Sequence, residues 1–209
     1  MNRVFNLSSV ITALLGVVIL LAGCQNDQQS VTAKSWSLIA ENSQISLFAV
    51  KAEDVGEVFT IGLQSGSVSD TGKVTIKFAP NEIETGIPIR NSRMGKYLFE
   101  TEKWPIATVT AQLETTVIEK IANGTRQILP VEITVDLHGV SATYESFFIA
   151  SSTHEGQVII NSATPISVHA ADFGLSAGLD KLKELAGLSS ITPVIAVSFN
   201  LVFESKQLK

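Results

Sequence analysis

Three histidines, His138, His154 and His169, are the side chains of this sequence best suited to proton transfer or metal binding. Their spacings of 16 and 15 residues match no local metal-binding motif. His138 lies on the polar face at a strand end and His154 in a turn, which favours surface or hydrogen-bonded roles. The sequence also has no nucleophile elbow and no phosphate-binding glycine loop. We therefore predict no catalytic residue, no metal ligand and no cofactor, while isolated carboxylates such as Asp136 or Asp172 leave an enzyme as an open alternative.

A short run of basic residues is the other group of side chains that could bind a ligand. Arg90, Arg93 and Lys96 recur at three-residue spacing in a chain with 15 Lys+Arg and 20 Asp+Glu. On a helix, side chains three residues apart project from one side. The run forms either an ordinary solvated face or a set of contacts for the anionic or polar head group of a ligand, because Arg binds phosphate oxygens with two nitrogens.

Cys24, the single cysteine, follows a stretch with the features of a secretory signal. Residues 1–23 carry one charge and then an apolar run of about 12 residues, which is too short to span a membrane. The tetrapeptide Leu-Ala-Gly-Cys that ends at Cys24 resembles a bacterial lipobox, in which the cysteine is acylated after the leader is cleaved. We predict a lipoprotein signal peptide at 1–23, a lipidated flexible tether at 24–35 and membrane attachment through Cys24. The resemblance to bacterial lipoproteins implies that Gln25, a residue other than Asp directly after the cysteine, favours sorting to the outer membrane.

Composition excludes further classes of protein. The chain has 209 residues, a formal net charge of −5, 17% charged residues and 45% hydrophobic residues. These values exclude an intrinsically disordered protein and give no general attraction to nucleic acid. The mean hydropathy of +0.29 comes mostly from the leader. The remainder is the size of one globular domain, which we place at 36–204 with a C-terminal tail at 205–209.

Beyond the tether, apolar residues recur with a period of two, as in half-buried strands. The segments with this pattern are 73–78, 130–138, 195–204 and, more weakly, 43–51, 55–64, 106–115, 141–151 and 156–161. Two other stretches, 87–100 and 178–188, have apolar residues near helical spacing. The pattern predicts an all-β fold, with a meandering antiparallel sheet of about eight strands and one or two short helices at an end of it.

Strands with one apolar face must cover that face, and a barrel does so by closing the sheet on itself. The interior of an eight-stranded barrel is either filled by side chains or holds one small ligand. Small residues on one face of 106–115, such as Ala107 and Ala111, favour a cavity, whereas large residues such as Phe48 and Phe59 could fill it. The residues that we predict to line a cavity are Val74, Ile76, Phe78, Phe99, Ala107, Val109, Ala111, Leu113, Val131, Ile133, Val135, Leu137, Phe173, Val197, Phe199 and Leu201.

Several motifs occur in a fixed order along the chain. They are Trp-Ser-Leu at 36–38, Glu-Ile-Glu-Thr-Gly at 82–86, Trp-Pro at 104–105, Leu-His-Gly-Val at 137–140 and Asp-Phe-Gly at 172–174. Together they resemble the YceI-like family of periplasmic, polyisoprenoid-binding proteins. Two positions depart from the family pattern: Asn91 replaces the usual acidic neighbour of Arg90, and alanines precede Asp172 where an arginine is common.

The resemblance implies an eight-stranded, lipocalin-like barrel around a long-chain isoprenoid or similar amphiphile, with no cofactor and no catalytic reaction. We therefore expect a lipid-anchored protein of the bacterial envelope, in the outer membrane facing the periplasm. It would store, shield or transport a polyisoprenoid or fatty ligand. A lipid-anchored interaction or assembly module with a filled core is the alternative. The sequence leaves the identity of the ligand and the oligomeric state, a dimer included, open.

Overall fold

The computed structural model describes residues 35–206. The predicted leader at 1–23, the lipidation site Cys24 and nearly all of the predicted tether lie outside this range. Among the described residues, no helix is long and apolar enough to cross a membrane.

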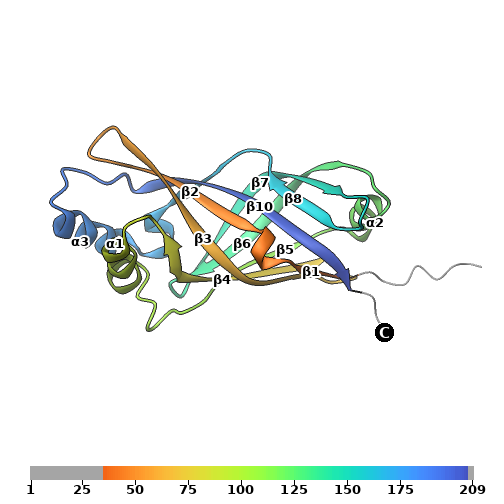
Figure 1. Ribbon diagram of the computed structural model, residues 1–209, viewed down its shortest axis with the longest axis horizontal. Coiled ribbons are helices and arrows are strands. Elements are labelled where there is room, and N and C mark those ends of the chain that lie inside the picture. Colours follow the sequence, from red (N-terminus) through yellow and green to blue (C-terminus); the bar gives the residue numbers. More distant parts are fainter. Residues whose placement is uncertain (1–34, 207–209) are drawn as a thin grey trace, which may run out of the picture. The chain divides into compact units, whose positions relative to one another are not determined.

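Within residues 35–206, eight antiparallel strands close into a barrel (Figure 1). They are β2 (Gln44–Lys51), β3 (Val55–Val68), β4 (Lys73–Glu84), β5 (Ala107–Gln112), β6 (Gln127–Leu137), β7 (Val140–Ser152), β8 (Val158–Ser162) and β10 (Val194–Lys206). Each pairs with the next, and β10 pairs with both β8 and β2, which completes the ring. The predicted antiparallel barrel of eight strands is confirmed, since each predicted segment overlaps one of these strands.

Two short strands extend the ring. β1 (Ser35–Leu38) pairs with β10 and β3, and β9 (Ile166–His169) pairs with β10. β1 places Trp36 in the core, where it is 5% exposed. β10 continues to Lys206, two residues beyond the boundary that the sequence suggested for the domain.

The register sets large and small residues opposite each other on the inner face of the barrel. Val74 of β4 pairs with Ala111 of β5, and Phe78 pairs with Ala107. Because side chains alternate between the two faces of a strand, these four point toward the interior together. The small residues of β5 thus lie beside the larger ones of β4 on the inner face.

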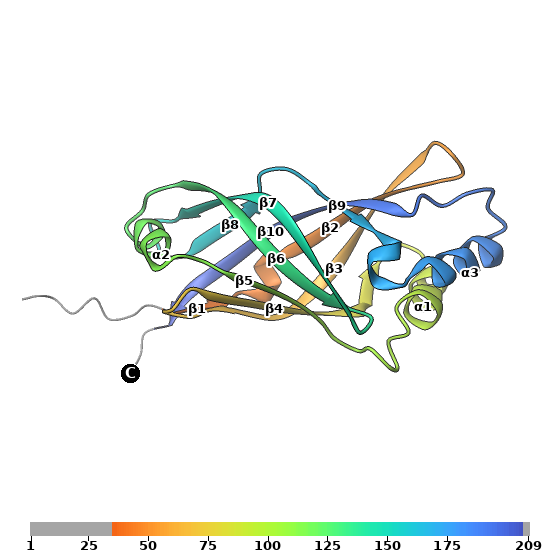
Figure 2. The ribbon, with the colours of Figure 1, turned by 180° about the vertical axis from the view of Figure 1, so that it is seen from behind.

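Helices stand at both ends of the barrel (Figures 1 and 2). At one end lie α1 (Pro88–Arg93), the π-helical turn η2 (Met94–Leu98) and α3 (Ser176–Ala186), which confirm the two helical stretches read from the sequence. The 3-10 turn η3 (Ala170–Phe173) precedes α3, and a second one, η1 (Ala40–Asn42), joins β1 to β2.

At the other end lies α2 (Thr115–Ala122), which the sequence pattern does not predict. Its first residues, Thr-Thr-Val-Ile, are β-branched and favour a strand. Its helical form is stabilised by packing, since Ile118 and Ile121 are 8% and 5% exposed in the same core cluster as Trp36. Tertiary burial here overrides the local preference.

The turn between β6 and β7 holds the segment between η2 and β5 in place. His138 and Gly139 both have positive φ, 55° and 74°, as the two central residues of a type I′ hairpin turn require. A Cβ atom on Gly139 would lie 2.4 Å from the ring of Trp104, so only glycine allows this approach. Trp104 follows η2, and the turn therefore holds the segment between η2 and β5 against the barrel.

Candidate ligand cavity and its polar rim

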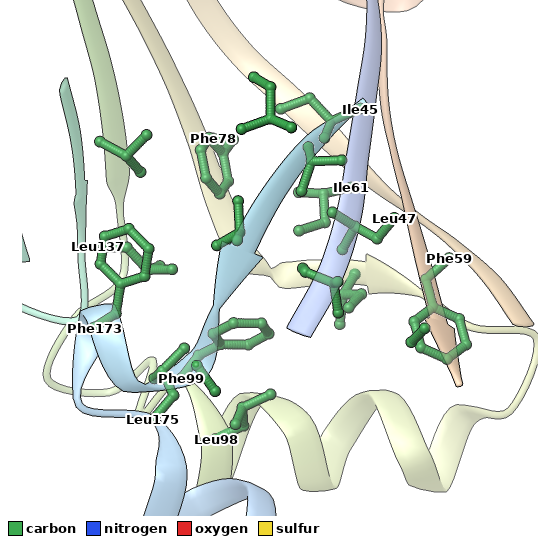
Figure 3. A pocket seen from close by; sticks show the side chains of 18 of the residues that line it. Ile45, Leu47, Phe59, Ile61, Phe78, Leu98, Phe99, Leu137, Phe173 and Leu175 are labelled. Atoms are coloured by element: carbon green, nitrogen blue, oxygen red, sulfur yellow. The ribbon is translucent and has the colours of Figure 1, made fainter. Parts of the chain in front are cut away.

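The barrel encloses a cavity of about 520 Å³. This volume lies within the roughly 300–1,000 Å³ that small-molecule sites occupy. The lining is almost entirely aliphatic and aromatic, and Figure 3 shows that side chains such as Ile45, Ile61 and Phe78 project into one space with Phe99 and Phe173. The space is a built apolar site and not a set of isolated packing defects, because strands from the whole ring and the helices at one end contribute to it.

All but one of the predicted lining residues border this cavity. The exception is Ala107, which is 0% exposed and belongs to the packed core beside Phe78, its partner in the register. A small residue on the inner face therefore marks free space at Ala111 but close packing at Ala107. The difference arises from the size of the residue opposite, Val74 at one position and Phe78 at the other.

Other lining residues were not selected from the sequence. They include inward residues of β2 and β3, the apolar faces of η2 and α3, and parts of β7 and β9, for example Ile45, Leu47, Phe59, Ile61, Met94, Leu98, Tyr144, Phe148, Ile166, Val168, Leu179 and Leu182. Those on the strands follow the same period-two alternation, and those on the helices follow the apolar stripe of each capping segment. Both signals are present in the sequence and could have been extended to them.

The cavity reaches the surface at the end covered by α1 and α3. Ile87 and Ile89 both border the cavity and are 43% and 59% exposed. Ala186, at the end of α3, and Thr192 are also exposed lining residues. This end is the mouth of the cavity, and the opposite end is covered by α2.

The charged lining residues gather at the mouth. Lys51 and Glu57 come from the adjacent ends of β2 and β3, and Arg90 and Arg93 come from α1. Lys51 Nζ lies 3.0 Å from Glu57 Oε2, and Arg90 Nη1 lies 2.8 Å from the same oxygen. These four side chains give the apolar cavity a polar rim at one end only.

Arg90 is fully engaged in holding α1 to the barrel wall. Nη1 donates to both carboxylate oxygens of Glu57 at 3.0 and 2.8 Å. Nε donates to the hydroxyl of Thr85 at 2.9 Å and Nη2 to its carbonyl at 2.7 Å. The guanidinium also lies 4.7 Å from the centre of the Phe59 ring, within the range of a cation–π contact. With these partners, Arg90 has little capacity left for a ligand.

The carboxylate partner of Arg90 is held in its charged form. Partial burial acts to raise the pKa of Glu57, but hydrogen bonds from Arg90 and Lys51 outweigh it and leave the pKa below its ordinary value. Asn91, which stands where an acidic residue is usual, instead accepts hydrogen bonds from the backbone N–H and hydroxyl of Thr85. Glu57, on β3, supplies the negative charge for Arg90.

The three predicted cations have different positions. Arg93 borders the cavity and is half-buried, and within residues 35–206 its guanidinium makes one hydrogen bond, from Nη1 to the carbonyl of Leu185 at 3.2 Å. Lys96 is exposed and does not border the cavity; its ammonium lies 5.1 Å from the ring centre of Tyr97. The structure therefore brings Arg90 and Arg93, but not Lys96, to the mouth.

His138 occupies a structural position, whereas His169 borders the cavity. The ring of His138 makes two hydrogen bonds of 3.1 Å, one between Nδ1 and the carbonyl oxygen of Phe173 and one between Nε2 and Oε2 of Glu100. The ring therefore joins η3 to the segment after η2. The backbone N–H of His169 donates to Asp172 at 3.4 Å. Across the described part of the chain, no group of three His, Cys, Asp or Glu side chains is placed to hold a metal ion.

Tyr144 is a polar side chain of the barrel wall. It borders the cavity, and its hydroxyl donates to Asp172 Oδ2 at 2.8 Å. Burial, and then the hydrogen bond and charge of Asp172, raise the pKa of Tyr144 well above its ordinary value. The hydroxyl is thus a neutral donor that is already satisfied, and it adds no charge to the cavity.

Comparisons with known proteins agree with this geometry. A search of curated protein sequences gives no match. Among solved structures, a polyisoprenoid-binding domain from Saccharophagus degradans implicated in plant cell wall breakdown is 31% identical, with a TM-score of 0.78 over 82% of this chain and 98% of that one. BcnA of Burkholderia cenocepacia shares the fold, at 14% identity and a TM-score of 0.57 over 79% of this chain and 98% of its own. The YceI-like domain profile matches residues 36–203, and the chain therefore belongs to the YceI-like family.

Proposed function

We propose that this barrel binds a long-chain apolar ligand, a polyisoprenoid or a fatty amphiphile, with its tail in the cavity and its polar end at the mouth. The observation that carries the proposal is the apolar cavity of about 520 Å³, which opens at one end of the barrel. Burial of apolar surface at about 25 cal/mol per Å² drives the binding of such a tail. The similarity to a polyisoprenoid-binding domain supports the same ligand class.

The polar rim gives the ligand one orientation. Within residues 35–206, the Lys, Arg and Glu side chains that border the cavity lie near α1 and the β2–β3 hairpin, whereas the deep end is apolar. A phosphate or other polar head group therefore stays at the mouth, since burying it at the deep end without partners would be costly. Arg93 is the head-group contact that we propose, because Arg90 is engaged with Glu57 and Thr85 and Lys96 lies outside the cavity.

Two other functions are less well supported. An assembly module with a filled core requires a packed interior, and the cavity argues against it. An isoprenoid-modifying enzyme requires a proton donor or acceptor beside the tail or head group. Glu57 is the carboxylate at the mouth, and its two cationic partners stabilise it as an ion-paired anion, which suits a structural role better than proton transfer.

The cellular role that we propose follows from the N-terminal sequence. Acylation of Cys24 would hold the protein to a membrane, and Gln25 favours the outer membrane facing the periplasm. There the domain would store, shield or carry its ligand between sites in the envelope. Metabolic labelling with an alkyne fatty acid tests the anchor: the wild-type protein should be labelled, and a Cys24→Ser variant should not.

Extraction of the purified protein into organic solvent, followed by mass spectrometry, tests the ligand. We expect one lipid class with a long apolar tail, near one molecule per protein. The test variant is Ala111→Phe, which places a ring in the cavity, and its matched control is Thr110→Phe on the outer face of the same strand. Loss of the lipid from the first variant alone supports the proposal. A wild-type protein that yields no lipid and binds none when lipid is added would overturn it.

A further inference from the structure

The deep end of the cavity is closed by a single layer of side chains. Leu113, Ile160 and Phe203 border the large cavity, and the same three residues also border a second void of about 20 Å³ beneath it. They come from the residue after β5, from β8 and from β10. We call these three residues the floor.

The far side of the second void is lined by buried apolar side chains. Trp36 and Val68 border it from β1 and β3, and Ile118 and Ile121 border it from α2. All four are at most 8% exposed. The cavity therefore ends on the floor, which has a small free space behind it. The buried side chains of β1, β3 and α2 lie beyond that space.

We propose that the floor sets the longest tail that the barrel accepts. The inference rests on the proposed function, since a tail meets the floor only if its polar end stays at the mouth. With the head group held near Arg93, every carbon added to the tail extends toward Leu113 and Phe203. Once the tail touches the floor, a longer tail must bend within the cavity or leave carbons in water.

Apolar burial gives the expected dependence of affinity on tail length. Each buried methylene contributes about 0.8 kcal/mol, so each carbon that fits strengthens binding about fourfold. A carbon beyond the floor contributes nothing or weakens binding, because overpacking a filled interior is unfavourable. Affinity should therefore rise with tail length and then stop rising at a defined length, the cut-off.

Two substitutions should move this cut-off in opposite directions. Leu113→Ala removes three side-chain carbons from the floor and joins the cavity to the void below, which makes room for about three more tail carbons. Ala111, in β5, is the next inward residue toward the mouth. Ala111→Leu raises the floor by about one inward position, or about 5 Å along the barrel axis, because the strands are tilted. Ile89→Ala is the control, since it also removes hydrocarbon from the lining, but at the exposed mouth.

The experiment measures the affinity of the delipidated protein for straight-chain fatty alcohols and linear prenols of increasing length, by displacement of a fluorescent lipid probe. Circular dichroism and urea unfolding confirm that each variant is folded before it is titrated. Ile160→Val, a smaller change in the same layer, replaces Leu113→Ala if that variant unfolds.

We expect a longer cut-off for Leu113→Ala, a shorter one for Ala111→Leu and an unchanged one for Ile89→Ala. If the wild-type protein binds these alcohols and the cut-off stays the same in both Leu113→Ala and Ala111→Leu, the floor does not limit the tail, and the proposed function remains. If the wild-type protein binds no member of either series, the proposed function fails and this inference fails with it.

Discussion

Arg90 and Arg93 lie three residues apart on α1, and their different neighbours predict different effects when each is replaced by glutamine. Arg90 donates four hydrogen bonds, two of them to Glu57. Arg93 donates one, to a backbone carbonyl, and borders the cavity. Arg90→Gln should therefore lower the stability of the fold, whereas Arg93→Gln should lower the affinity for a ligand with an anionic head group.

The exposure of the ion pair sets the expected loss of stability. The side chains of Arg90 and Glu57 are 21% and 25% exposed, which lies between a surface pair worth at most about 1 kcal/mol and a buried pair whose disruption costs about 3–5 kcal/mol. Lys51 stays 3.0 Å from Glu57 in the variant, so the carboxylate keeps one cation. We expect Arg90→Gln to lower the free energy of unfolding by about 2 kcal/mol and the Tm by about 4–8 °C.

The expected cost of Arg93→Gln to the fold is that of one hydrogen bond, about 1 kcal/mol. Its effect on binding should be larger. A charged hydrogen bond contributes about 1.5–3 kcal/mol, which corresponds to a loss of roughly 10- to 100-fold in affinity for a prenyl phosphate. The prenol with the same tail has no charge to lose, and its affinity should change little.

Urea unfolding measures the first effect, and titration with a prenyl phosphate and the matching prenol measures the second. Lys96→Gln is the control for a lost positive charge, because Lys96 is exposed and does not border the cavity. An Arg90→Gln protein that is as stable as the wild type but no longer distinguishes phosphate from alcohol would refute the assignment. Equal losses of phosphate affinity in Arg93→Gln and Lys96→Gln would indicate long-range charge and not a contact.

Three further predictions concern the fold and the cavity wall. The pKa of Glu57 is lowered in the folded state, so the Glu57 carboxylate stabilises the fold above about pH 4.5, and this stabilisation is lost as the pH falls through the folded pKa. Urea unfolding of Glu57→Gln should therefore depend less on pH in that acidic range than unfolding of the wild type. Ala107→Phe should lower the free energy of unfolding by about 1–3 kcal/mol or more, because Ala107 is 0% exposed. Ala111→Phe should mainly reduce lipid uptake, because Ala111 borders the cavity. Similar stability of the two variants would contradict this distinction. Gly139→Ala should destabilise the protein by at least about 1 kcal/mol in thermal unfolding, since the new Cβ would meet Trp104 at a residue with positive φ, and an unchanged Tm would count against the fixed position of that loop.

The strands could be predicted from the sequence because each buries one face. A period of two along β4, β6 and β10 is the direct consequence of a wall with an apolar interior, and the same pattern identifies residues that border the cavity. The local pattern fails at α2, where β-branched residues precede Ile118 and Ile121. Those two residues are buried against the end of the barrel, where Trp36 of β1 and Phe203 of β10, both distant in the sequence, border the same void.

The polar rim could be predicted only in part for a similar reason. Regular spacing on α1 shows that Arg90, Arg93 and Lys96 are near one another, but it does not show which of them has a partner. The partner of Arg90 is Glu57, which lies 33 residues earlier on β3. Only the folded arrangement separates an arginine that holds α1 in place from an arginine that retains donors at the mouth.

The placement of charge also explains how a cavity with few hydrogen-bonding groups can select a ligand. Nearly all of the binding free energy comes from apolar contact, which alone would accept any oily molecule that fits. Under the two proposals, the charged side chains at the mouth would give the ligand a direction, and the three floor residues would give it an end point. These two features lie at opposite ends of the barrel, so the charged mouth would select the head group and the floor would select the length of the tail. A substitution at either end should therefore change one preference and leave the other unchanged.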